Sequence, residues 1–418
     1  MKVLLLPILI VVLLSVGDAR AVALTPSQIE RIESLIRQAM AANHAPGATF
    51  AIGLDYDVNW TEGFGLADVE NGVPTKPDTE YRSASIGKPM TATAVMELRD
   101  QGRVDIDSPI EKYCPRFPPK PWPITARDLL SHTSGIRAPN ETTELHNTTH
   151  FEHVSDALDI FDRDPLAMRP GTDMLYTTWG YVTLGCVLEG ATGDEYRALM
   201  KRMIFDPAGM TETRDDDPRA IIPNRAHGYI VENGVLKNSA WADMSSNLPA
   251  GGWVTTAPDL VRFMNAWMSG KFVSAKTQAE MLTPYVLPRH NGTVDGYGMG
   301  WFLDGYHGMR AGLHGGGTPP GVRHRVLRAR KEACHRRVLQ CREYSRKDAH
   351  RTCGSHCRCH PRREDTECGQ VPAVGGITTV LVRTSRSHAA LNRATGYSAT
   401  ATRIPKRSCR AFRSRLSE

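Results

Sequence analysis

A serine that lies three residues before a lysine, at a point where a helix should begin, most constrains how this chain can fold. Ser85 and Lys88 form this pair, and Pro89 follows directly. From Met90 onward, apolar residues recur at helical intervals, so the serine and the lysine should share one face of the first turn. Proline is tolerated near a helix start and not in a helix interior, which agrees with this placement. We therefore expect a helix that begins beside Ser85.

The spacing of Ser85 and Lys88 is also suited to nucleophilic catalysis. A lysine near the positive end of a helix dipole, and half removed from water, is disfavoured as the ammonium. The neutral amine of Lys88 could then take the proton of the Ser85 hydroxyl and make Ser85 a nucleophile. About one serine-x-x-lysine is expected by chance in a chain of this composition, and this pair is the only one present. The pair alone leaves a catalytic origin and chance both open.

The composition changes abruptly near Gly321. Residues 322–418 hold 23 Lys and Arg against 7 Asp and Glu, whereas residues 1–321 hold 28 against 38. The same C-terminal segment holds seven of the nine cysteines. With 41% hydrophobic residues, the chain has enough apolar material for a sizeable core. We therefore expect one globular domain over residues 24–321 and a compositionally unrelated tail over residues 322–418.

The N-terminal residues 1–23 have the features of a secretory signal peptide. A lysine precedes the apolar run from Val3 to Val16, and small residues then alternate up to Ala23. The apolar run is short for a membrane span. We expect a secreted or extracytoplasmic protein with no stable membrane span after signal removal. Four glycosylation sequons fit export, although about two would arise by chance; they begin at Asn59, Asn140, Asn147 and Asn291.

The tail, residues 322–418, is open to several interpretations. Some of its residues are of zinc-ligand type, but their spacing matches no standard zinc pattern. These residues are Cys353, Cys357, Cys359, His360 and Cys368. The seven cysteines could instead form disulfides, with one left unpaired. A shifted reading frame in the gene model explains the abrupt change best, and the tail should be largely disordered. Despite the basic charge, we expect no nucleic-acid partner, because a secreted protein is an odd place for that function.

Periodic patterns within residues 24–321 predict both helices and strands. Apolar residues on one face indicate an amphipathic helix over residues 28–40, which Thr25 and Pro26 could start. A buried strand is expected over residues 47–54, and a second strand, interrupted by glycines, over residues 60–69. We also expect a short helix within residues 124–136, helices that begin near Thr178, Asp194 and Thr256, and a hairpin over residues 297–314 that turns at Asp304-Gly305.

His132 lies in the segment Leu-Leu-Ser-His-Thr-Ser-Gly that ends at Gly135, and a histidine in such a place raises the question of a catalytic role. No acid that could pair with it is identifiable nearby. We favour a histidine whose hydrogen bonds are satisfied within a turn.

Three motifs, taken in chain order, resemble those of a known enzyme family. Ser85-x-x-Lys88 is followed by Tyr176-x-Thr178 and by His314-Gly-Gly. This set resembles the class C beta-lactamase and penicillin-binding-protein-like serine hydrolases, where Ser-x-x-Lys is one of several active-site motifs. Each of the later motifs alone has an ordinary structural explanation, a helix-flanking aromatic or a turn, but their order favours the family. The resemblance covers residues 27–321 and extends to residues 124–136, 207–210 and 249–252.

The resemblance and the periodic patterns together imply an α+β fold. A mostly antiparallel sheet, built from the N-terminal strands and the late hairpin, should be flanked by helices. A helical subdomain should span residues 90–270, with a cleft between it and the sheet. The family continues after its His-x-Gly strand with two further strands and a C-terminal helix. In this chain only residues 377–382 could serve as a strand, so we expect the final strands and the C-terminal helix to be missing.

The resemblance also implies a role for each motif residue. Ser85 would be the nucleophile, and Lys88 and Tyr176 would share general-base and general-acid duty, with the lysine ammonium favouring a tyrosine phenolate. The backbone N–H groups of Ser85 and Gly317 would form an oxyanion hole. The substrate-binding residues would be Thr178, His314, Gly316 and Gly317, with His314 orienting the substrate. We expect no cofactor and no metal ion in this site.

Thr178 bears on the choice of substrate. Penicillin-recognising members of the family usually have an asparagine here, whose side-chain amide holds the amide carbonyl of the substrate, and a hydroxyl is a poorer match. The resemblance therefore favours an esterase or a peptidase over an efficient beta-lactamase. The alternative is a non-catalytic, ligand-binding member of the same fold that is inactive because its last strands are lost. The expected partner is a small-molecule or peptide substrate, and the sequence does not predict the oligomeric state.

Overall fold

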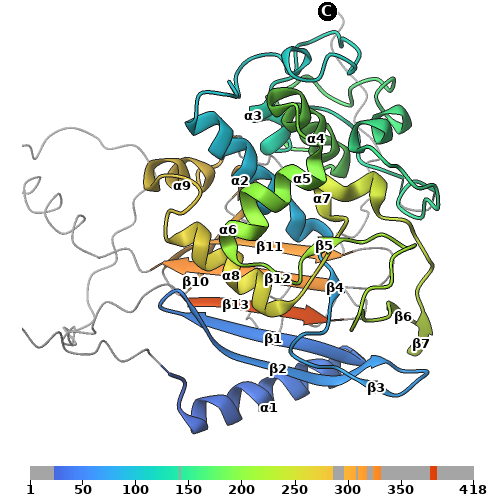
Figure 1. Ribbon diagram of the computed structural model, residues 1–418, viewed down its shortest axis with the longest axis vertical. Helices are drawn as coiled ribbons and strands as arrows, with labels where there is room; N and C mark the ends of the chain where they lie inside the picture. The colour runs from blue at the N-terminus through green and yellow to red at the C-terminus, as the bar shows by residue number, and fades with distance from the viewer. Residues whose placement is uncertain are drawn as a thin grey trace, which may run out of the picture.

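An antiparallel sheet forms one layer of the molecule and takes strands from distant parts of the chain (Figure 1). The computed structural model describes residues 23–140, 143–285, 296–306, 309–317, 323–330 and 377–383. Within these residues, eight strands follow the order β3-β2-β1-β13-β12-β11-β10-β9. Their bounds are β1 (Gly47–Leu54), β2 (Asp57–Asp68), β3 (Val73–Pro74), β9 (Gly296–Tyr297), β10 (Phe302–Tyr306), β11 (Met309–Gly317), β12 (Arg323–Arg330) and β13 (Ile377–Arg383).

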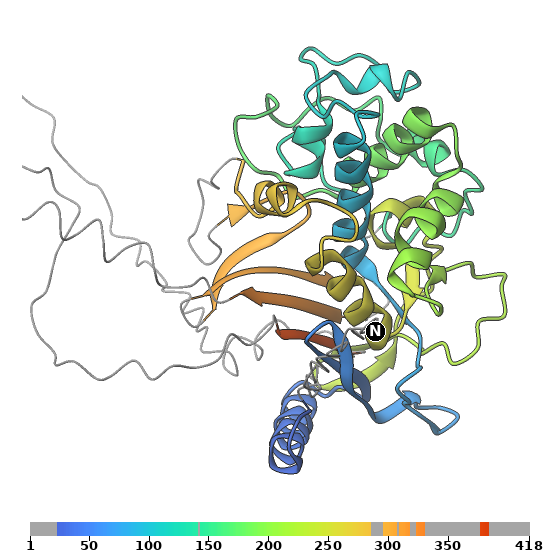
Figure 2. The same ribbon diagram turned by 60° about the vertical axis from the view of Figure 1, so that its left-hand side comes forward.

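Strand β1 is buried on both of its faces. Phe50 belongs to a small apolar cluster that the strand shares with helix α1 (Pro26–Ala42). The next residue, Ala51, belongs instead to a larger core that includes Val261 of helix α8 (Ala257–Met268). Successive side chains of a strand point to opposite faces, so the sheet is packed between helices. Figure 2 shows α1 and α8 on opposite sides of the sheet.

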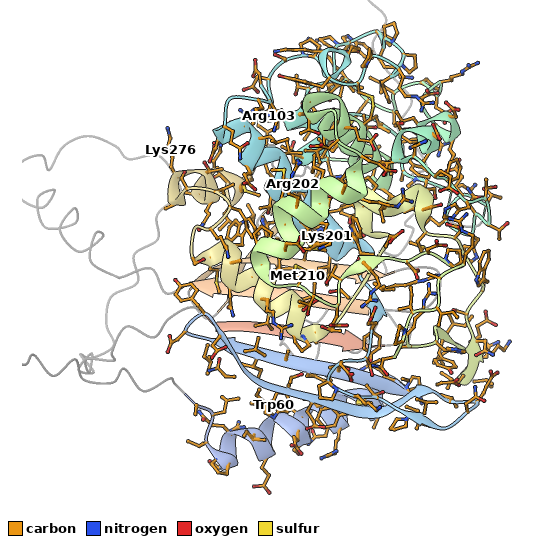
Figure 3. The ribbon with its side chains drawn as sticks, viewed as in Figure 1. Trp60, Arg103, Lys201, Arg202, Met210 and Lys276 are labelled. Carbon is orange, nitrogen blue, oxygen red and sulfur yellow. A yellow bond between two sulfur atoms is a disulfide. The ribbon has the colours of Figure 1, made fainter. Side chains whose placement is uncertain are left out.

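Two residues labelled in Figure 3 mark these two cores. Trp60 lies on β2 and packs against the small cluster beside α1. Met210 lies just after helix α6 (Asp206–Ala208) and is buried in the larger core. The larger core runs from the sheet into the helices, so the two layers form one hydrophobic interior.

A second, mostly helical layer lies above the sheet in Figure 1. At its centre is α2 (Gly87–Asp100), whose first ten residues are all buried. The other helices of this layer are α3 (Ala126–Leu130), α4 (Thr178–Thr192), α5 (Tyr196–Met200), α7 (Leu248–Gly251) and α9 (Ala275–Met281), with 3-10 turns at Ala84–Ile86, Ile110–Lys112, Val154–Ile160 and Ser245–Asn247 and a π-helical turn at Lys201–Phe205. None of the helices within the described ranges is long and apolar enough to cross a membrane.

Two smaller sheets accompany the eight-stranded one. In the first, β8 (Trp253–Thr255) lies between β4 (Tyr81–Arg82) and β5 (Arg214–Asp215). The second is a hairpin of β6 (Tyr229–Glu232) and β7 (Val235–Asn238). Because β4 directly precedes the turn that carries Ser85, its pairing with β8 fixes where that turn starts.

The capping residues explain where the helices start. The Thr25 side chain accepts a hydrogen bond from the Gln28 N–H and the Gln28 side chain accepts one from the Thr25 N–H, so α1 begins where the sequence predicted. Thr256 caps α8 in a similar way. Helix α4 does begin at Thr178, but its N-cap is Thr177 rather than Thr178. The predicted helix near Asp194 begins two residues later, at Tyr196.

The predicted late hairpin is present, with its turn in a different place. Asp304 and Gly305, which we expected to form the turn, lie within β10 and pair with residues of β11. The strands continue as far as the pair Tyr306 and Met309, which moves the turn further along the chain. A glycine after an aspartate is a turn signal only when the flanking strands end there, and here they do not.

Two strands of the sheet come from the segment that we expected to be a separate tail. Strand β12 pairs with β11 along residues 310–317, and β13 pairs with both β12 and β1. The expectation that the final strands are missing was therefore wrong, while the α+β class with a mostly antiparallel sheet is confirmed. Strand β13 coincides with the one strand-like run noted in the tail, but the arginine-rich β12 has no alternating apolar pattern that could have marked it.

Several sequence predictions lie outside the described residues. These concern the signal peptide up to residue 22, the expected loss of the C-terminal helix and the seven cysteines of the tail. The division into a domain over residues 24–321 and a tail stays a prediction. What the structure adds is that residues 323–330 and 377–383 belong to the same sheet as β1.

A disulfide joins Cys114 to Cys186 of α4, 72 residues further along the chain. Both cysteines are buried. The sequence showed only that these two stand apart from the cysteine-rich tail. A cross-link that closes a loop of this length restricts the unfolded chain, by about 4 kcal/mol on the loop-entropy model. The bridge thus ties α4 to the segment that follows the 3-10 turn Ile110–Lys112.

Candidate active site

Ser85 lies in a tight turn that leads into α2. The preceding residue, Ala84, has a φ of 49°, a conformation that residues other than glycine rarely adopt. Neighbouring backbone holds the turn: the Ser83 N–H donates to the Trp253 carbonyl at 2.7 Å. On the other side, a Cβ at Gly251 would lie 1.7 Å from the Ala84 carbonyl oxygen, so only a glycine fits there. The nucleophile candidate is therefore fixed by backbone contacts.

Lys88 lies one helical turn further on and is completely buried. Its Nζ donates to the Ser85 Oγ at 2.9 Å and to the Ala250 carbonyl at 3.4 Å. The same nitrogen lies over the aromatic rings of Tyr176 and Tyr181, 4.9 and 5.7 Å from their centroids. The two residues predicted from the sequence to share one helical face are thus in direct contact.

Burial dominates the ionisation of Lys88. Removal from water lowers the pKa of its amine from 10.5 to about 7. This change corresponds to about 5 kcal/mol against the ammonium. A cation–π contact with a desolvated ring favours the ammonium by about 2 kcal/mol, too little to reverse the effect of burial. At neutral pH a large fraction of Lys88 is therefore the neutral amine that a general base requires.

Tyr176 lies on the loop before α4 and its hydroxyl is hydrogen-bonded to Ser85. The residue as a whole is half-buried, but its phenol lies deep enough for burial to raise its pKa above the ordinary value. From the sequence we expected the lysine ammonium to favour a phenolate. In the structure the effect of burial is larger, which favours a protonated Tyr176 that donates or relays a proton while Lys88 acts as the base.

His314 lies on β11 and is completely buried. Its Nδ1 is 2.7 Å from the Gly315 carbonyl oxygen, so this nitrogen carries the proton and donates it. Its Nε2 then accepts from the Tyr297 hydroxyl at 3.1 Å. Burial lowers the pKa of the imidazole to about 3, so the ring is neutral. Both nitrogens already have partners, and His314 could orient a substrate directly only by giving up one of them.

The end of β11 packs against the Ser85 turn. A Cβ at Gly316 would lie 2.7 Å from the Ser83 carbonyl oxygen and 3.1 Å from the Ser85 nitrogen. At Gly317 a Cβ would meet no atom within 4 Å. Glycine at 316 therefore allows the strand to approach the Ser85 N–H, while position 317 borders open space. This arrangement suits the predicted oxyanion hole, whose role stays a prediction.

Strand β12 holds this part of β11 from one side. The two strands pair continuously up to Gly317, which lies opposite Arg323. From the sequence we expected the final strands to be missing, which would have left this strand end without this neighbour, and that expectation was wrong. Strand β10 pairs with β11 only as far as Leu313, so within the described residues the last part of β11 has a strand partner on one side alone.

The structure thus brings most of the predicted site residues together. Ser85, Lys88 and Tyr176 are in mutual contact. The ring centroids of Tyr176 and His314 lie 6.3 Å apart. Thr178, two residues after Tyr176, is half-buried and is the first residue of α4.

His132 lies close to the predicted site residues. This residue does lie in a turn, as expected, with a φ of 60°. However, its ring packs against Tyr176 with the centroids 4.2 Å apart. The available signal was the segment Leu-Leu-Ser-His-Thr-Ser-Gly, which contributed to the family resemblance. The ring contacts an aromatic side chain and accepts a hydrogen bond from the Thr177 N–H, and a search of the sequence for a partner acid could reveal neither contact.

One surface group combines residues that can bind metal ions. Within the described residues, the ligand atoms of Asp68, Glu70 and His227 lie within 4.8 Å of one another. Glu70 and His227 are exposed, and both oxygens of Asp68 accept hydrogen bonds from Asn71 at 3.1 and 2.6 Å. These contacts account for Asp68 as part of a turn, and the group carries no metal-site assignment.

Lys88 should set the pH dependence of acylation at Ser85. The amine loses its proton as the pH rises through about 7, and only the neutral form can accept the serine proton. The rate of labelling by a fluorophosphonate should therefore rise through pH 7 and level off above it. Lys88→Ala should lose both the rise and most of the rate. A rise that is unchanged in Lys88→Ala would show that another group titrates.

Gly316 and Gly317 offer a matched pair of substitutions. Gly316→Ala should lower the acylation rate by about a hundredfold, because the new methyl group would displace the Ser85 turn by a fraction of an ångström or more. Gly317→Ala keeps the backbone N–H and places its methyl group in open space, so its effect should be less than about fivefold. Single-turnover acylation rates of the two variants test this difference, and equal losses would contradict the packing argument.

Comparison with known proteins agrees with this geometry. A family model described as Beta-lactamase matches residues 32–330. The relative "Serine beta-lactamase-like protein LACTB, mitochondrial" from Homo sapiens is 29% identical over 360 residues, with coverage of 68% of this chain and 66% of that protein. The chain spans about two thirds of the length of such curated relatives.

Solved structures share the fold. The octameric penicillin-binding protein homologue from Pyrococcus abyssi has a TM-score of 0.66 and 23% identity, with coverage of 85% of this chain and 73% of that one. The D-amino acid amidase from Ochrobactrum anthropi SV3, complexed with L-phenylalanine amide, has a TM-score of 0.64 and 23% identity, with coverage of 85% and 91%. At this identity the structures establish the fold alone. The family model, in contrast, matches the sequence from within α1 to the end of β12, and the chain therefore belongs to the Beta-lactamase family of serine hydrolases.

Proposed function

We propose that this chain is a serine hydrolase that acts through an acyl-enzyme on Ser85. The observation that carries the proposal is the 2.9 Å hydrogen bond between the Lys88 Nζ and the Ser85 Oγ, with the lysine completely buried. A lysine in water is an ammonium at neutral pH and cannot accept a proton. A buried lysine with a pKa of about 7 can, so the contact supports a nucleophile with its base.

In the proposed acylation step, the Ser85 Oγ bonds to the substrate carbonyl carbon while its proton passes to the Lys88 Nζ. The carbonyl oxygen becomes negatively charged, and the N–H groups of Ser85 and Gly317 would donate hydrogen bonds to it. The bond to the leaving group then breaks as the leaving group takes a proton. Tyr176 would donate this proton, because its protonated hydroxyl lies beside Ser85. Lys88, whose Nζ lies 4.9 Å from the Tyr176 ring centroid, would then return a proton to it.

Deacylation repeats the same transfers with water as the nucleophile. A water molecule gives its proton to the neutral Lys88 amine and bonds to the acyl carbon. The ester bond to Ser85 then breaks, and the serine oxygen takes back a proton. Lys88 thus acts first as base and then as acid in both half-reactions, which microscopic reversibility requires of such a group.

The proposed substrate is an ester or an amide, with efficient beta-lactam hydrolysis less favoured. Thr178 offers a hydroxyl where an asparagine amide would hold a beta-lactam side chain. The fold of the D-amino acid amidase supports an amide of amino-acid type as one candidate. Among the described residues, no strand pairs with the β10 side of β11 beyond Leu313, and such an edge supports an extended acyl group because it can bond to a peptide-like chain.

The alternative function is ligand binding without catalysis. The reason for this alternative was the expected loss of the final strands, which would have left β11 without a neighbouring strand. Since β12 pairs with β11 up to Gly317, this reason for expecting an inactive protein no longer holds. The contact between Ser85 and Lys88 has no evident use in a protein that only binds.

We also propose export of the protein, on two observations. Residues 1–23 carry the pattern of a signal peptide, and the Cys114–Cys186 disulfide suits an oxidising compartment. Protein secreted by a eukaryotic host should begin close to Leu24 and carry this bridge. Mass spectrometry of unreduced tryptic peptides would detect both, and an intracellular product that retains residue 1 would contradict export.

The test of the proposed function is active-site labelling of the full chain. A fluorophosphonate should modify the wild-type protein on Ser85 and leave Ser85→Ala unlabelled, with peptide mass spectrometry to locate the label. Tyr176→Phe should lower kcat on an ester by about a hundredfold or more with little change in KM, because a proton relay acts in the transition state. Undiminished labelling of Ser85→Ala would exclude Ser85 as the nucleophile.

Thr178→Asn tests the assignment of the substrate class. On our reading, the amide should raise the acylation rate with a labelled penicillin and leave the turnover of a simple ester within about threefold of wild type. Thr178→Val is the matched control, since it keeps the size and removes the hydroxyl. If the wild-type protein hydrolyses a beta-lactam as fast as it hydrolyses esters, the preference for esterase or peptidase activity is wrong.

A further inference from the structure

We propose that His132 is a positioning residue that holds Tyr176 in place for proton transfer. The proposal rests on the proposed function of Tyr176 as the proton relay. It assigns a role in the reaction to a histidine that lies outside the three active-site motifs.

His132 bonds to the backbone on both sides of Tyr176. The N–H of Leu175, one residue before the tyrosine, donates to the His132 carbonyl at 2.8 Å. The N–H of Thr177, one residue after it, donates to the His132 Nδ1 at 3.2 Å. The imidazole also lies 4.2 Å from the tyrosine ring, centroid to centroid. One residue therefore fixes both the backbone and one face of the tyrosine.

The bond to Thr177 requires a neutral imidazole. An N–H can donate only to a ring nitrogen that carries no proton, so Nδ1 is unprotonated and Nε2 carries the hydrogen. Burial, together with the nearby Lys88 ammonium, keeps the pKa of His132 well below its ordinary value. The ring is therefore in the form that can accept this bond over the whole neutral range.

The chemistry of His132 indicates that its Nδ1 acceptor is the reason for a histidine at this position. Its side chain is completely buried, and its Nε2 has no hydrogen-bond partner within the described residues. A buried N–H without a partner costs free energy that an apolar side chain would avoid. What an apolar side chain cannot supply is the acceptor for the Thr177 N–H. The retained imidazole is explained by that acceptor.

His132 is itself held by the loop in which it lies. The Thr133 N–H donates to the Asp128 carbonyl at 2.8 Å, and the Thr133 hydroxyl donates to the Asp128 carboxylate at 3.1 Å. The Gly171 N–H in turn donates to the Thr133 carbonyl at 2.9 Å. Several hydrogen bonds thus join the loop after α3 to the loop before α4. Because His132 makes two of these bonds, it holds Tyr176 at a fixed position relative to α3.

Two substitutions separate the acceptor from the rest of the side chain. His132→Asn places an amide oxygen close to the Nδ1 position, and asparagine tolerates the positive φ of this residue. His132→Gln carries the same amide one bond further out, near the Nε2 position. His132→Asn should keep kcat on an ester within about fivefold of wild type, whereas His132→Gln should lower it about 10- to 100-fold with KM nearly unchanged.

A double-mutant cycle with Tyr176→Phe distinguishes positioning from a general structural role. If His132 acts through the tyrosine hydroxyl, His132→Gln should lower the residual acylation rate of Tyr176→Phe by less than about twofold. Equal fold losses from His132→Gln in both backgrounds would overturn the proposal. A loss above about tenfold in a folded His132→Asn would also overturn it, even if His132→Gln fails to fold. If Tyr176→Phe alone leaves the acylation rate unchanged, the proposed function of Tyr176 as the proton relay is wrong, and the role of His132 is not what failed.

Discussion

The removal of the Lys88 amine from water is the interaction on which the site depends. Burial disfavours the ammonium by about 5 kcal/mol, which is a large fraction of the stability of an ordinary domain. Packing in the larger core, in which the first ten residues of α2 are buried, offsets this unfavourable free energy. The surrounding parts follow from this requirement: a carbonyl from α7 to accept a hydrogen bond, and aromatic rings in place of carboxylates. A carboxylate beside Lys88 would restore the ammonium and remove the base.

Much of the fold could be predicted from local patterns. The capping threonines at 25 and 256 located two helices, and the apolar run over residues 47–54 located β1, because these signals act within a few residues. The contact between Ser85 and Lys88 followed from helical periodicity alone. The places of Tyr176 and His314 beside this pair followed from the family resemblance, since no local pattern brings three distant segments together.

What the sequence did not reveal depends on contacts between distant segments. The pairing of Cys114 with Cys186 arises only when the segment after the 3-10 turn Ile110–Lys112 packs against α4. The contact of His132 with Tyr176 arises only when the loop after α3 meets the loop before α4. Composition misled us about β12, because its arginines gave no alternating pattern, although it pairs with β11 along eight residues. The ionisation of Tyr176 was also misjudged: the neighbouring charge is visible in a motif, whereas the depth of burial is not.

The order of the strands has a consequence for how the protein is made. Strand β13 lies between β1 and β12, so residues 50 and 381 are partners in the sheet. The ribosome must add about 50 residues after β12 before β13 exists, which takes about 3 to 10 s at ordinary rates of synthesis. During that interval β1 and β12 each present an open edge to other chains. Each open edge is a place where newly synthesised chains can pair with one another before β13 is made.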